Sequence, residues 1–503
     1  MTETNQDRTS VDAATPQGDP VLANPDLAPT TPEDRNWGAG SFIAVWMGIA
    51  HNVNQWILVA SMLALGMSFW QATGAVLLSF AIVYVATILS GTIGTRFGLA
   101  FPPIARAVFG RQGSYVPIIL RATSGVLQLG VFVYVTGEGL ANFLDIVVPG
   151  LKGLAQYHIV GISGDVAIAY VIAFLLHAYI ATHGIERIRR FELWGGPLIM
   201  VVAAGLFVWA LVAAHGITPI VSVPSSIASG EFWPIFLVSV AGLIGSMSSL
   251  IVNNPDIARF ARSQKAQFIG QGIGIPVMFV VFSLITIVAT LGTKFAFGHI
   301  INDPLKILNH FSEHPALVAF GSLCIAASTL SLNAATNAVS AGFDFTGLFP
   351  KLLNFRRAVT ISLFIGVVSV PWLWYGNAHI TTILYGTLGV GMGPVLGALL
   401  ADFYLIRKRH IDVDALLRGA APYNYRAGWN TRAIAALTIG VLIAVIGLLI
   451  PAVRVLYQFN WFLGVAGAII AYTALMWPAR AIDDNGLKHD VGQSSRGRAP
   501  DPS

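Results

Sequence analysis

A polar stretch, Ala50–Gln55, interrupts the first long apolar segment of the chain and contains His51, Asn52 and Asn54. Apolar runs flank it at 41–49 and 56–67. Inside a bilayer an unsatisfied polar group costs several kcal/mol, so polar residues at this depth are expected to line a cavity or bind something. The small and polar residues at 242–249 should interrupt the sixth apolar segment similarly. Paired interruptions in two halves are typical of the binding sites of secondary transporters.

Two ionisable side chains within apolar segments are further candidates for proton transfer or gating. Glu138 lies late in the third segment, where a carboxylate is either a proton carrier or a structural hydrogen-bond partner. His51 titrates near neutral pH in water, so it is either a proton site or a residue that orients neighbouring helices. Three aspartates at segment ends are predicted either to be solvated or to form ion pairs or gate contacts with basic residues nearby in sequence: Asp256 with Arg259, Asp344 with Lys351, and Asp402 with Arg407.

The composition indicates an all-α polytopic membrane protein. Of the 503 residues, 55% are hydrophobic and only 11% are charged, and the mean hydropathy is +0.70. A soluble protein carries about 25% charged residues. The net charge of +5 calls for no nucleic-acid partner, because the basic residues lie in loops between apolar segments. The single cysteine, Cys324, excludes an intrachain disulfide.

Twelve apolar segments are long enough to be bilayer-spanning helices. They lie near 41–67, 71–93, 115–144, 165–183, 194–214, 232–253, 269–292, 316–342, 358–375, 380–406, 432–451 and 456–477. The transmembrane domain is therefore expected at 37–478. The polar ends, 1–36 and 479–503, are predicted to be disordered.

The basic residues are concentrated in the loops that follow even-numbered segments, as in Arg187–Arg190 and Arg407–Arg409. The positive-inside rule then places both termini of this multi-pass cell-membrane protein in the cytoplasm. Segments one to five (about 41–214) and six to ten (about 232–406) form two halves. Since five is odd, the second half starts from the opposite side, which predicts an inverted repeat. Two further helices at 432–477 complete the domain.

Several ordered motifs resemble the nucleobase–cation symporter-1 family. They are Asn24–Pro29, Arg35–Trp37, Trp46–Asn52, Asn254–Gln264, Gly393–Gly397, Ala401–Tyr404, Tyr423–Tyr425 and Gly428–Ala433. The resemblance implies a leucine-transporter-type fold, with ten core helices in a 5+5 inverted repeat plus two C-terminal helices. It also implies uptake of nucleobases, hydantoins, allantoin or related heterocycles, driven by sodium or protons.

The same resemblance, to the sodium-coupled hydantoin branch, implies a cation site between the first and eighth segments. Main-chain carbonyls of Ala50, Val53 and Ser328 and the hydroxyl of Ser331 would ligate Na⁺, and hard oxygen ligands suit a small cation. Leu332 replaces a second hydroxyl, so either Thr329 or Thr336 compensates for it or protons are the coupling ion. Helix–helix packing is the alternative role for Ser331 and Thr329. Apart from this ion, no cofactor is expected.

Substrate-binding residues are implied in the third, sixth and eighth segments. Gln128 and Phe132 fall where the branch has an aromatic and an amide, in exchanged order. Asn337 falls on an asparagine that pairs with the edge of the substrate ring, and an asparagine offers both a donor and an acceptor. Near the predicted sixth-segment break, the substrate would contact Gly245, Ser246 and Met247. Ordinary packing is the alternative for Phe132, and an interhelical hydrogen bond is the alternative for Asn337.

The expected partners are a small heterocycle, a coupling cation and the lipid bilayer, with a monomer as the expected state. Enzymatic function is not expected, because the sequence has no nucleotide-binding loop, no long soluble segment and no metal-ligand spacing. The alternatives are a symporter of a vitamin-like or pyridine heterocycle and, from another class, a channel or membrane receptor. Saturable uptake that collapses with the ion gradient would distinguish a symporter from a pore.

Overall fold

The computed structural model describes residues 24–182, 200–375 and 378–494, and this part of the chain is mainly helical. A short hairpin, β1 (His158–Ile159) and β2 (Ile162–Ser163), is its one sheet. The helices of the first half are α1 (Ala39–Ala50), α2 (Val53–Ala64), α3 (Phe69–Phe97), α4 (Phe101–Phe109), α5 (Tyr115–Val147), α6 (Gly164–Thr182), the helix Met200–Ala213 and α8 (Ile217–Val221).

The remaining helices follow in the same order. They are α9 (Phe232–Ala258), α10 (Gln264–Gly274), α11 (Pro276–Phe297), α12 (Pro304–Asn309), α13 (Pro315–Asn333), the π-helix η2 (Ala334–Ala338), α14 (Val339–Leu348), α15 (Phe355–Val368), α16 (Trp372–Tyr375), α17 (Ala378–Leu400), the π-helix η3 (Ala401–Ile406), α18 (Val413–Arg418), α19 (Thr431–Ala444), α20 (Ile446–Leu449) and α21 (Asn460–Ser494).

Each of the twelve predicted segments is mainly helical over the residues that the structure describes. Within the described ranges, eight helical segments are long and apolar enough to cross a bilayer, and the bent pair of α1 and α2 makes a ninth. Shorter helices occupy the other three predicted segments: Gly164–Ile180, Met200–Ala213 and α15. The predicted polytopic, all-α architecture is therefore confirmed.

The two predicted helix breaks have different outcomes. The helix axis bends by 58° between α1 and α2, so the break at Ala50–Gln55 is confirmed. The expected break at 242–249 is wrong, because α9 runs without interruption through it. Ser248 Oγ there is buried without a hydrogen-bond partner among the described residues, but Ser246 Oγ bonds within its own helix, to the Leu243 carbonyl at 2.7 Å. Such a bond satisfies a polar group without opening the backbone.

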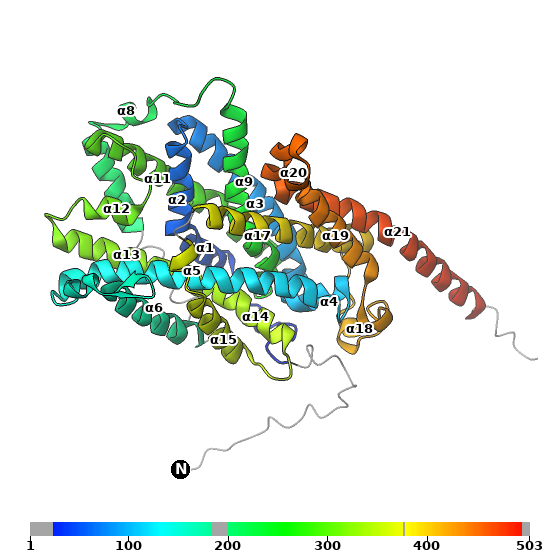
Figure 1. The fold of residues 1–503 in the computed structure, drawn as a ribbon. Helices are drawn as coiled ribbons and strands as arrows, with labels where there is room; N and C mark the ends of the chain where they lie inside the picture. The colour runs from blue at the N-terminus through cyan, green and yellow to red at the C-terminus, as the bar shows by residue number, and fades with distance from the viewer. Residues whose placement is uncertain (1–23, 183–199, 376–377, 495–503) are drawn as a thin grey trace, which may run out of the picture.

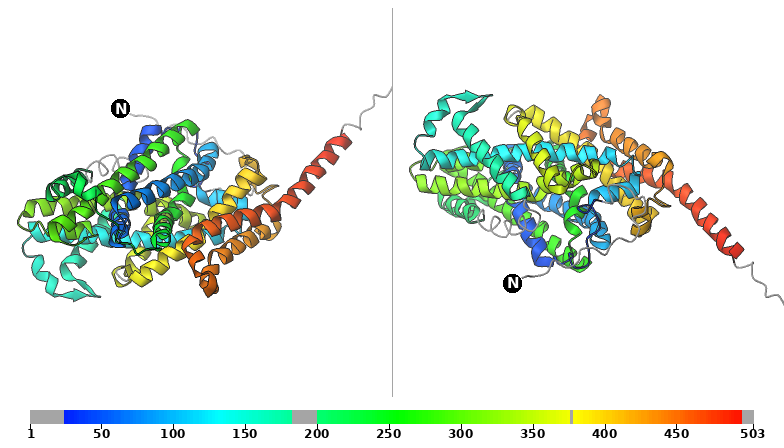
Figure 2. Two further views of the ribbon diagram at one scale, coloured as in Figure 1. Left: turned by 90° about the horizontal axis from the view of Figure 1, so that it is seen from above. Right: turned by 90° about the horizontal axis from the view of Figure 1, so that it is seen from below.

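The long helices pack in two groups, which we call group A and group B. Group A contains α1, α2, α3, α9, α10 and α11, and group B contains α5, α6, α13, α14 and α15. The C-terminal helices α19 and α21 pack with α17 along one flank, and α21 projects beyond the bundle in all views (Figures 1 and 2). Groups A and B thus form two packed bodies.

Glycines allow close helix contact inside each group. In group A, a Cβ on Gly94 would lie 2.7 Å from the backbone of Pro255. In group B, a Cβ on Gly130 would lie 2.1 Å from the carbonyl oxygen of Gly366. Membrane helices associate through such small-residue contacts because lipid supplies no hydrophobic drive for them to associate. Each group is thus tightly packed internally.

The two chain ends differ from the prediction of disorder. Residues 24–36 are ordered, because Leu27 is fully buried and Asn24 Nδ2 donates to the carbonyls of Pro350 and Leu353, each at 3.0 Å. At the other end, α21 continues to Ser494, so 479–494 is helical. The rest of both predicted tails, 1–23 and 495–503, lies outside the described residues.

Candidate functional site

The break between α1 and α2 is held by one side chain. Asn52 is the N-cap of α2, where its Oδ1 accepts the N–H of Gln55 at 2.8 Å. Its Nδ2 donates to the carbonyl of Ile49 at 2.8 Å, near the end of α1. Helix ends leave backbone groups unpaired, and a polar cap satisfies them. Asn52 therefore stabilises both ends of the break with a single carboxamide.

A cavity of about 40 Å³ adjoins this break and lies between groups A and B. It has room for about three water molecules, so a heterocycle fits only after the walls move apart. Its thirteen lining residues are Ile49, Asn52, Asn54, Gln128, Phe132, Ser246, Met247, Ser249, Leu250, Asn253, Leu332, Thr336 and Asn337.

The structure brings five of the six predicted substrate residues to this cavity. They are Gln128, Phe132, Ser246, Met247 and Asn337. The sixth, Gly245, does not line it, and a Cβ there would meet only open space. Gln128 and Asn337, more than 200 positions apart in sequence, thus line one cavity, on the helical segments that the resemblance implied.

Carboxamides give the cavity its chemical character. Five of the lining residues are Asn or Gln, and none of the thirteen carries a charge. Asn52 is committed to the helix break, as described above. Gln128 makes only a long bond, from Nε2 to the Ser124 hydroxyl at 3.4 Å. Carboxamides both donate and accept, so the site suits a neutral ring with amide-like edges.

The cavity is also lined by Asn54, Ser249 and Asn253, which were not predicted to bind substrate. Asn54 lies in the polar stretch that marked the break, so its composition was a sufficient signal. Ser249 and Asn253 follow Ser246 at helical spacing on α9, and positions three and seven apart share a helix face. Because a helix break was expected at 242–249, this helical periodicity was not used to predict lining residues.

The predicted cation residues are all buried near the break. Ala50 ends α1, Val53 begins α2, and α1 packs against α13, which carries Ser328 and Ser331. The hydroxyl of Ser328 donates to the Ile325 carbonyl at 3.0 Å, which leaves its own carbonyl as the proposed ligand. The hydroxyl of Ser331 is buried without a hydrogen-bond partner among the described residues. An orphaned oxygen of this kind fits a cation ligand.

The two proton or gating candidates lie in different surroundings. His51 is fully buried, with its ring centroid 5.0 Å from that of Phe282, and neither ring nitrogen has a hydrogen-bond partner in the described part of the chain. Glu138 accepts a hydrogen bond from the Tyr134 hydroxyl at 2.9 Å, one turn away. Neither side chain lines the cavity, and the bond to Tyr134 agrees with the structural alternative for Glu138.

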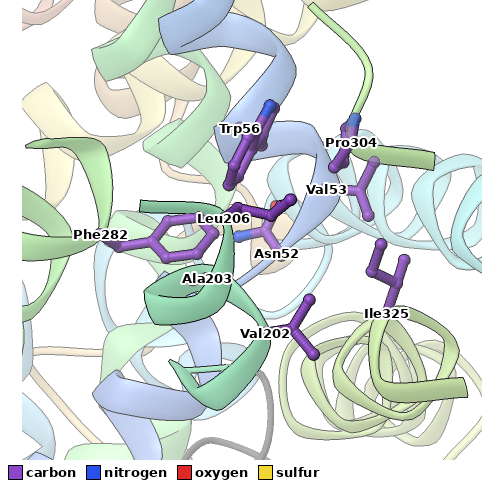
Figure 3. Close-up of a pocket in the computed structure, with 9 residues that line it drawn as sticks. All are labelled: Asn52, Val53, Trp56, Val202, Ala203, Leu206, Phe282, Pro304 and Ile325. Atoms are coloured by element: carbon purple, nitrogen blue, oxygen red, sulfur yellow. The ribbon is translucent and has the colours of Figure 1, made fainter. Parts of the chain in front are cut away.

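A second, apolar pocket also adjoins the break. Figure 3 shows the rings of Trp56 and Phe282 among its lining residues, together with Asn52. Its lining includes Val53 and Ile325 and has no charged residue. Asn52 lines both pockets, so the helix break adjoins both a polar space and an apolar one.

Two of the predicted ion pairs are wrong and one is confirmed. Asp256 and Asp344 both bond to Arg121, each at 2.9 Å, instead of pairing with their neighbours in sequence. All three side chains are buried, and the guanidinium also lies 4.4 Å from the ring centroid of Phe101. Asp402 pairs with Arg407 at 2.7 Å, as expected. The cluster around Arg121 connects α5, α9 and α14.

Comparisons with known proteins identify the family and the fold. The profile of permeases for cytosine/purines, uracil, thiamine and allantoin matches residues 29–464. The allantoin permease of Bacillus subtilis is 36% identical over 458 residues, which cover 90% of this chain and 93% of that protein. The purine-uracil permease NCS1 of Arabidopsis thaliana is 31% identical over 441 residues, 86% of this chain and 72% of that protein.

Solved structures share the fold. Mhp1, a nucleobase-cation-symport-1 transporter in a closed conformation with bromovinylhydantoin bound, superposes with a TM-score of 0.78 at 20% identity, covering 92% of this chain and 96% of Mhp1. A Na⁺-coupled sialic acid symporter gives 0.60 at 11% identity, covering 88% of this chain and 90% of that one. The fold is therefore of the leucine-transporter type. With the profile and the permease relatives, this establishes that the chain belongs to the nucleobase–cation symporter-1 family of membrane permeases.

Proposed function

We propose that this protein takes up a neutral nitrogen heterocycle by alternating access, coupled to a cation. The observation that carries the proposal is the cavity between groups A and B, lined by carboxamides and by no charged side chain. The permease relatives are named for allantoin and for purines and uracil, so these rings are the candidate substrates. Such rings present N–H and C=O groups in one plane, which amide side chains pair with directly.

Each predicted substrate residue has a distinct part in this proposal. Gln128 and Asn337 would hydrogen-bond the ring edge, and Phe132 would pack on its face. Ser246 and Met247 on α9 would form the opposite wall. Because α9 belongs to group A and the other three residues to group B or η2, a bound ring contacts both bodies and favours their closure.

A charged vitamin is a weaker candidate than a neutral ring. The family description includes thiamine, which carries a positive charge. Burying a charge needs a counter-charge, and the cavity lining offers none. A neutral vitamin-like or pyridine heterocycle stays the alternative substrate, and a channel or receptor is the alternative class.

The coupling cation is sodium or a proton. Sodium would be held by the carbonyls of Ala50, Val53 and Ser328 and by the Ser331 hydroxyl, where it would fix α1 against α13. The orphaned hydroxyl of Ser331 supports this choice. Leu332 lines the cavity one position later and has no oxygen in its side chain, which favours protons, with His51 or Glu138 as the carrier.

We further propose that both termini face the cytoplasm and that the protein functions as a monomer. The loop that leads from α9 to α10 carries Arg259 and Arg262, and Lys265 follows in the first turn of α10. Basic loops remain on the cytoplasmic side. The end of the bundle that contains Arg121 then faces inward. The repeat limits, 41–214 and 232–406, belong to the same proposal.

A thermal-shift screen of purified protein tests the proposed function. The panel contains allantoin, uracil, hypoxanthine, a hydantoin and neutral vitamins, each with and without sodium. A ligand that binds the folded state raises the free energy of unfolding, by about 2.7 kcal/mol at a hundredfold excess over Kd, and so raises the apparent melting temperature. Uptake in proteoliposomes that saturates and collapses with the ion gradient is expected. Stabilisation by none of the rings, or uptake that does not saturate, would contradict the proposal.

A further inference from the structure

Asn333 ends α13 one turn before Asn337 and is fully buried. Unlike Asn337, it does not line the cavity. Its Nδ2 donates to the main-chain carbonyl of Leu129 on α5 at 3.0 Å. Its Oδ1 accepts a hydrogen bond from Nδ2 of Asn337 at 2.8 Å. Leu129, Asn333 and Asn337 therefore form a chain of hydrogen bonds that leads from the α5 backbone to the cavity.

The direction of this chain is fixed by its first member. A main-chain carbonyl can only accept, so Asn333 must turn its NH₂ group toward Leu129. The side-chain carbonyl oxygen of Asn333 must then face Asn337, which has to donate an N–H to it. An asparagine amide can otherwise be turned by 180° with little change in shape. Here the network leaves Asn337 with its Oδ1 and one N–H for the cavity.

The backbone between the two asparagines supports the same arrangement. Ala334–Ala338 is a π-helix, inserted between α13 and α14. A π-turn changes the direction of the side chains that follow it, and such turns are frequent at functional sites. Thr336 on this turn bonds to the carbonyl of Leu332 at 2.8 Å and so does not compete for Asn337.

We propose that Asn333 is a positioning residue that holds Asn337 with its carbonyl oxygen toward the cavity. The site then selects rings that present an N–H donor at that edge, and it rejects rings in which this hydrogen is replaced. The inference rests on the proposed function, since it specifies the group of the substrate that Asn337 recognises. A buried acceptor left without a donor costs about 1–3 kcal/mol, or roughly five- to 150-fold in affinity.

The test measures affinity of purified protein for allantoin and uracil and for their ring N-methyl derivatives. The wild type should prefer the parent ring over at least one N-methyl form by about tenfold or more. Asn333→Ala should reduce the larger preference to within about threefold, because Asn337 is then free to turn. Asn333→Ser retains a hydroxyl that can donate and accept, so it should keep more of the preference than the alanine variant.

A double-mutant cycle separates positioning from a merely structural effect. If Asn333 acts through Asn337, the Asn333→Ala and Asn337→Ala double variant binds the parent ring no more weakly than Asn337→Ala alone. Asn142→Ala is the matched control, since it removes another asparagine–asparagine contact, to Asn309 at 3.4 Å, from α5 outside the cavity. It should keep the wild-type preference.

Each remaining outcome is decisive. A wild type without any preference between parent and N-methyl rings overturns the inference, as do losses that add in the double variant. Preference retained in Asn333→Ala also overturns it but leaves the proposed function intact. If the wild type binds no ring at all, the proposed function fails and this inference fails with it.

Discussion

The guanidinium of Arg121 on α5 and the carboxylate of Asp256 on α9 form a fully buried ion pair, with Nη1 and Oδ2 2.9 Å apart. The pair joins group B to group A. Asp344 on α14 shares the same guanidinium, but it lies in group B with α5. Movement of the two groups apart at this end therefore breaks the bond to Asp256 and preserves the bond to Asp344.

Asp256→Asn should favour the state that is open at the Arg121 end. Loss of one partner of a buried ion pair costs up to about 3–5 kcal/mol, so the melting temperature falls as well. The measurement is the rate of alkylation of a cysteine introduced at Ser340, in a Cys324→Ala background. Asp344→Asn is the control, because it weakens a bond inside group B and should lower stability without faster labelling. Equal labelling of both variants would contradict the assignment.

Asn337→Ala and Gln128→Ala should each weaken substrate binding about tenfold or more, with the protein still folded. Each change removes a hydrogen-bond partner of the ring, which is worth about 1–1.5 kcal/mol. Calorimetry on the ligand found in the thermal-shift screen measures the loss, and the elution profile on size exclusion checks the fold. Wild-type affinity in both variants would refute the site assignment.

Transport should persist, at least in part, when choline replaces sodium at acidic pH, because Leu332 lacks the hydroxyl expected of a second side-chain ligand. Leu332→Thr adds that hydroxyl and should increase the stimulation of uptake by sodium. Leu332→Val is the matched control, since valine has the shape of threonine without its oxygen. Strict sodium dependence of the wild type would show that another group compensates for Leu332.

Two glycine substitutions should have opposite effects on stability. Gly242→Ala in α9 should raise stability by about 0.5–1 kcal/mol, because alanine is the better helix former and its Cβ would meet no atom within 4 Å. Gly130→Ala should lower stability by about 1–3 kcal/mol or more, since its Cβ would overlap the Gly366 carbonyl. Melting curves in detergent compare them. Destabilisation and lost transport in Gly242→Ala would argue that α9 must break there during the cycle.

Much of the fold followed from the sequence because apolar runs and a polar break are local signals. The bend at Asn52 was predictable in this way. The continuous α9 was not, because small residues permit a break without requiring one, and serine hydroxyls can bond to their own helix. The pairing of Arg121 with Asp256 and Asp344 joins positions 135 and 223 residues apart, whereas proximity in sequence favoured nearer cations.

The candidate site was predictable where a resemblance supplied positions, as for Gln128 and Asn337. Asn253 could have been found from helical spacing once α9 was taken as unbroken. Asn333 could not, because its contribution depends on which main-chain carbonyl lies opposite it in the packed bundle. The ordered stretch 24–36 was missed because one leucine, Leu27, anchors it, and a single apolar residue gives no periodic signal.

The N-terminal stretch 24–36 also limits how far groups A and B can move apart. Asn24 is bonded to Pro350 beside group B, and six residues later Thr30 Oγ1 donates to the Arg259 carbonyl at the end of α9, at 2.8 Å. Six extended residues span at most about 20 Å. The N-terminal segment therefore links group B to group A. It must release one anchor before the two bodies can part further than its own length.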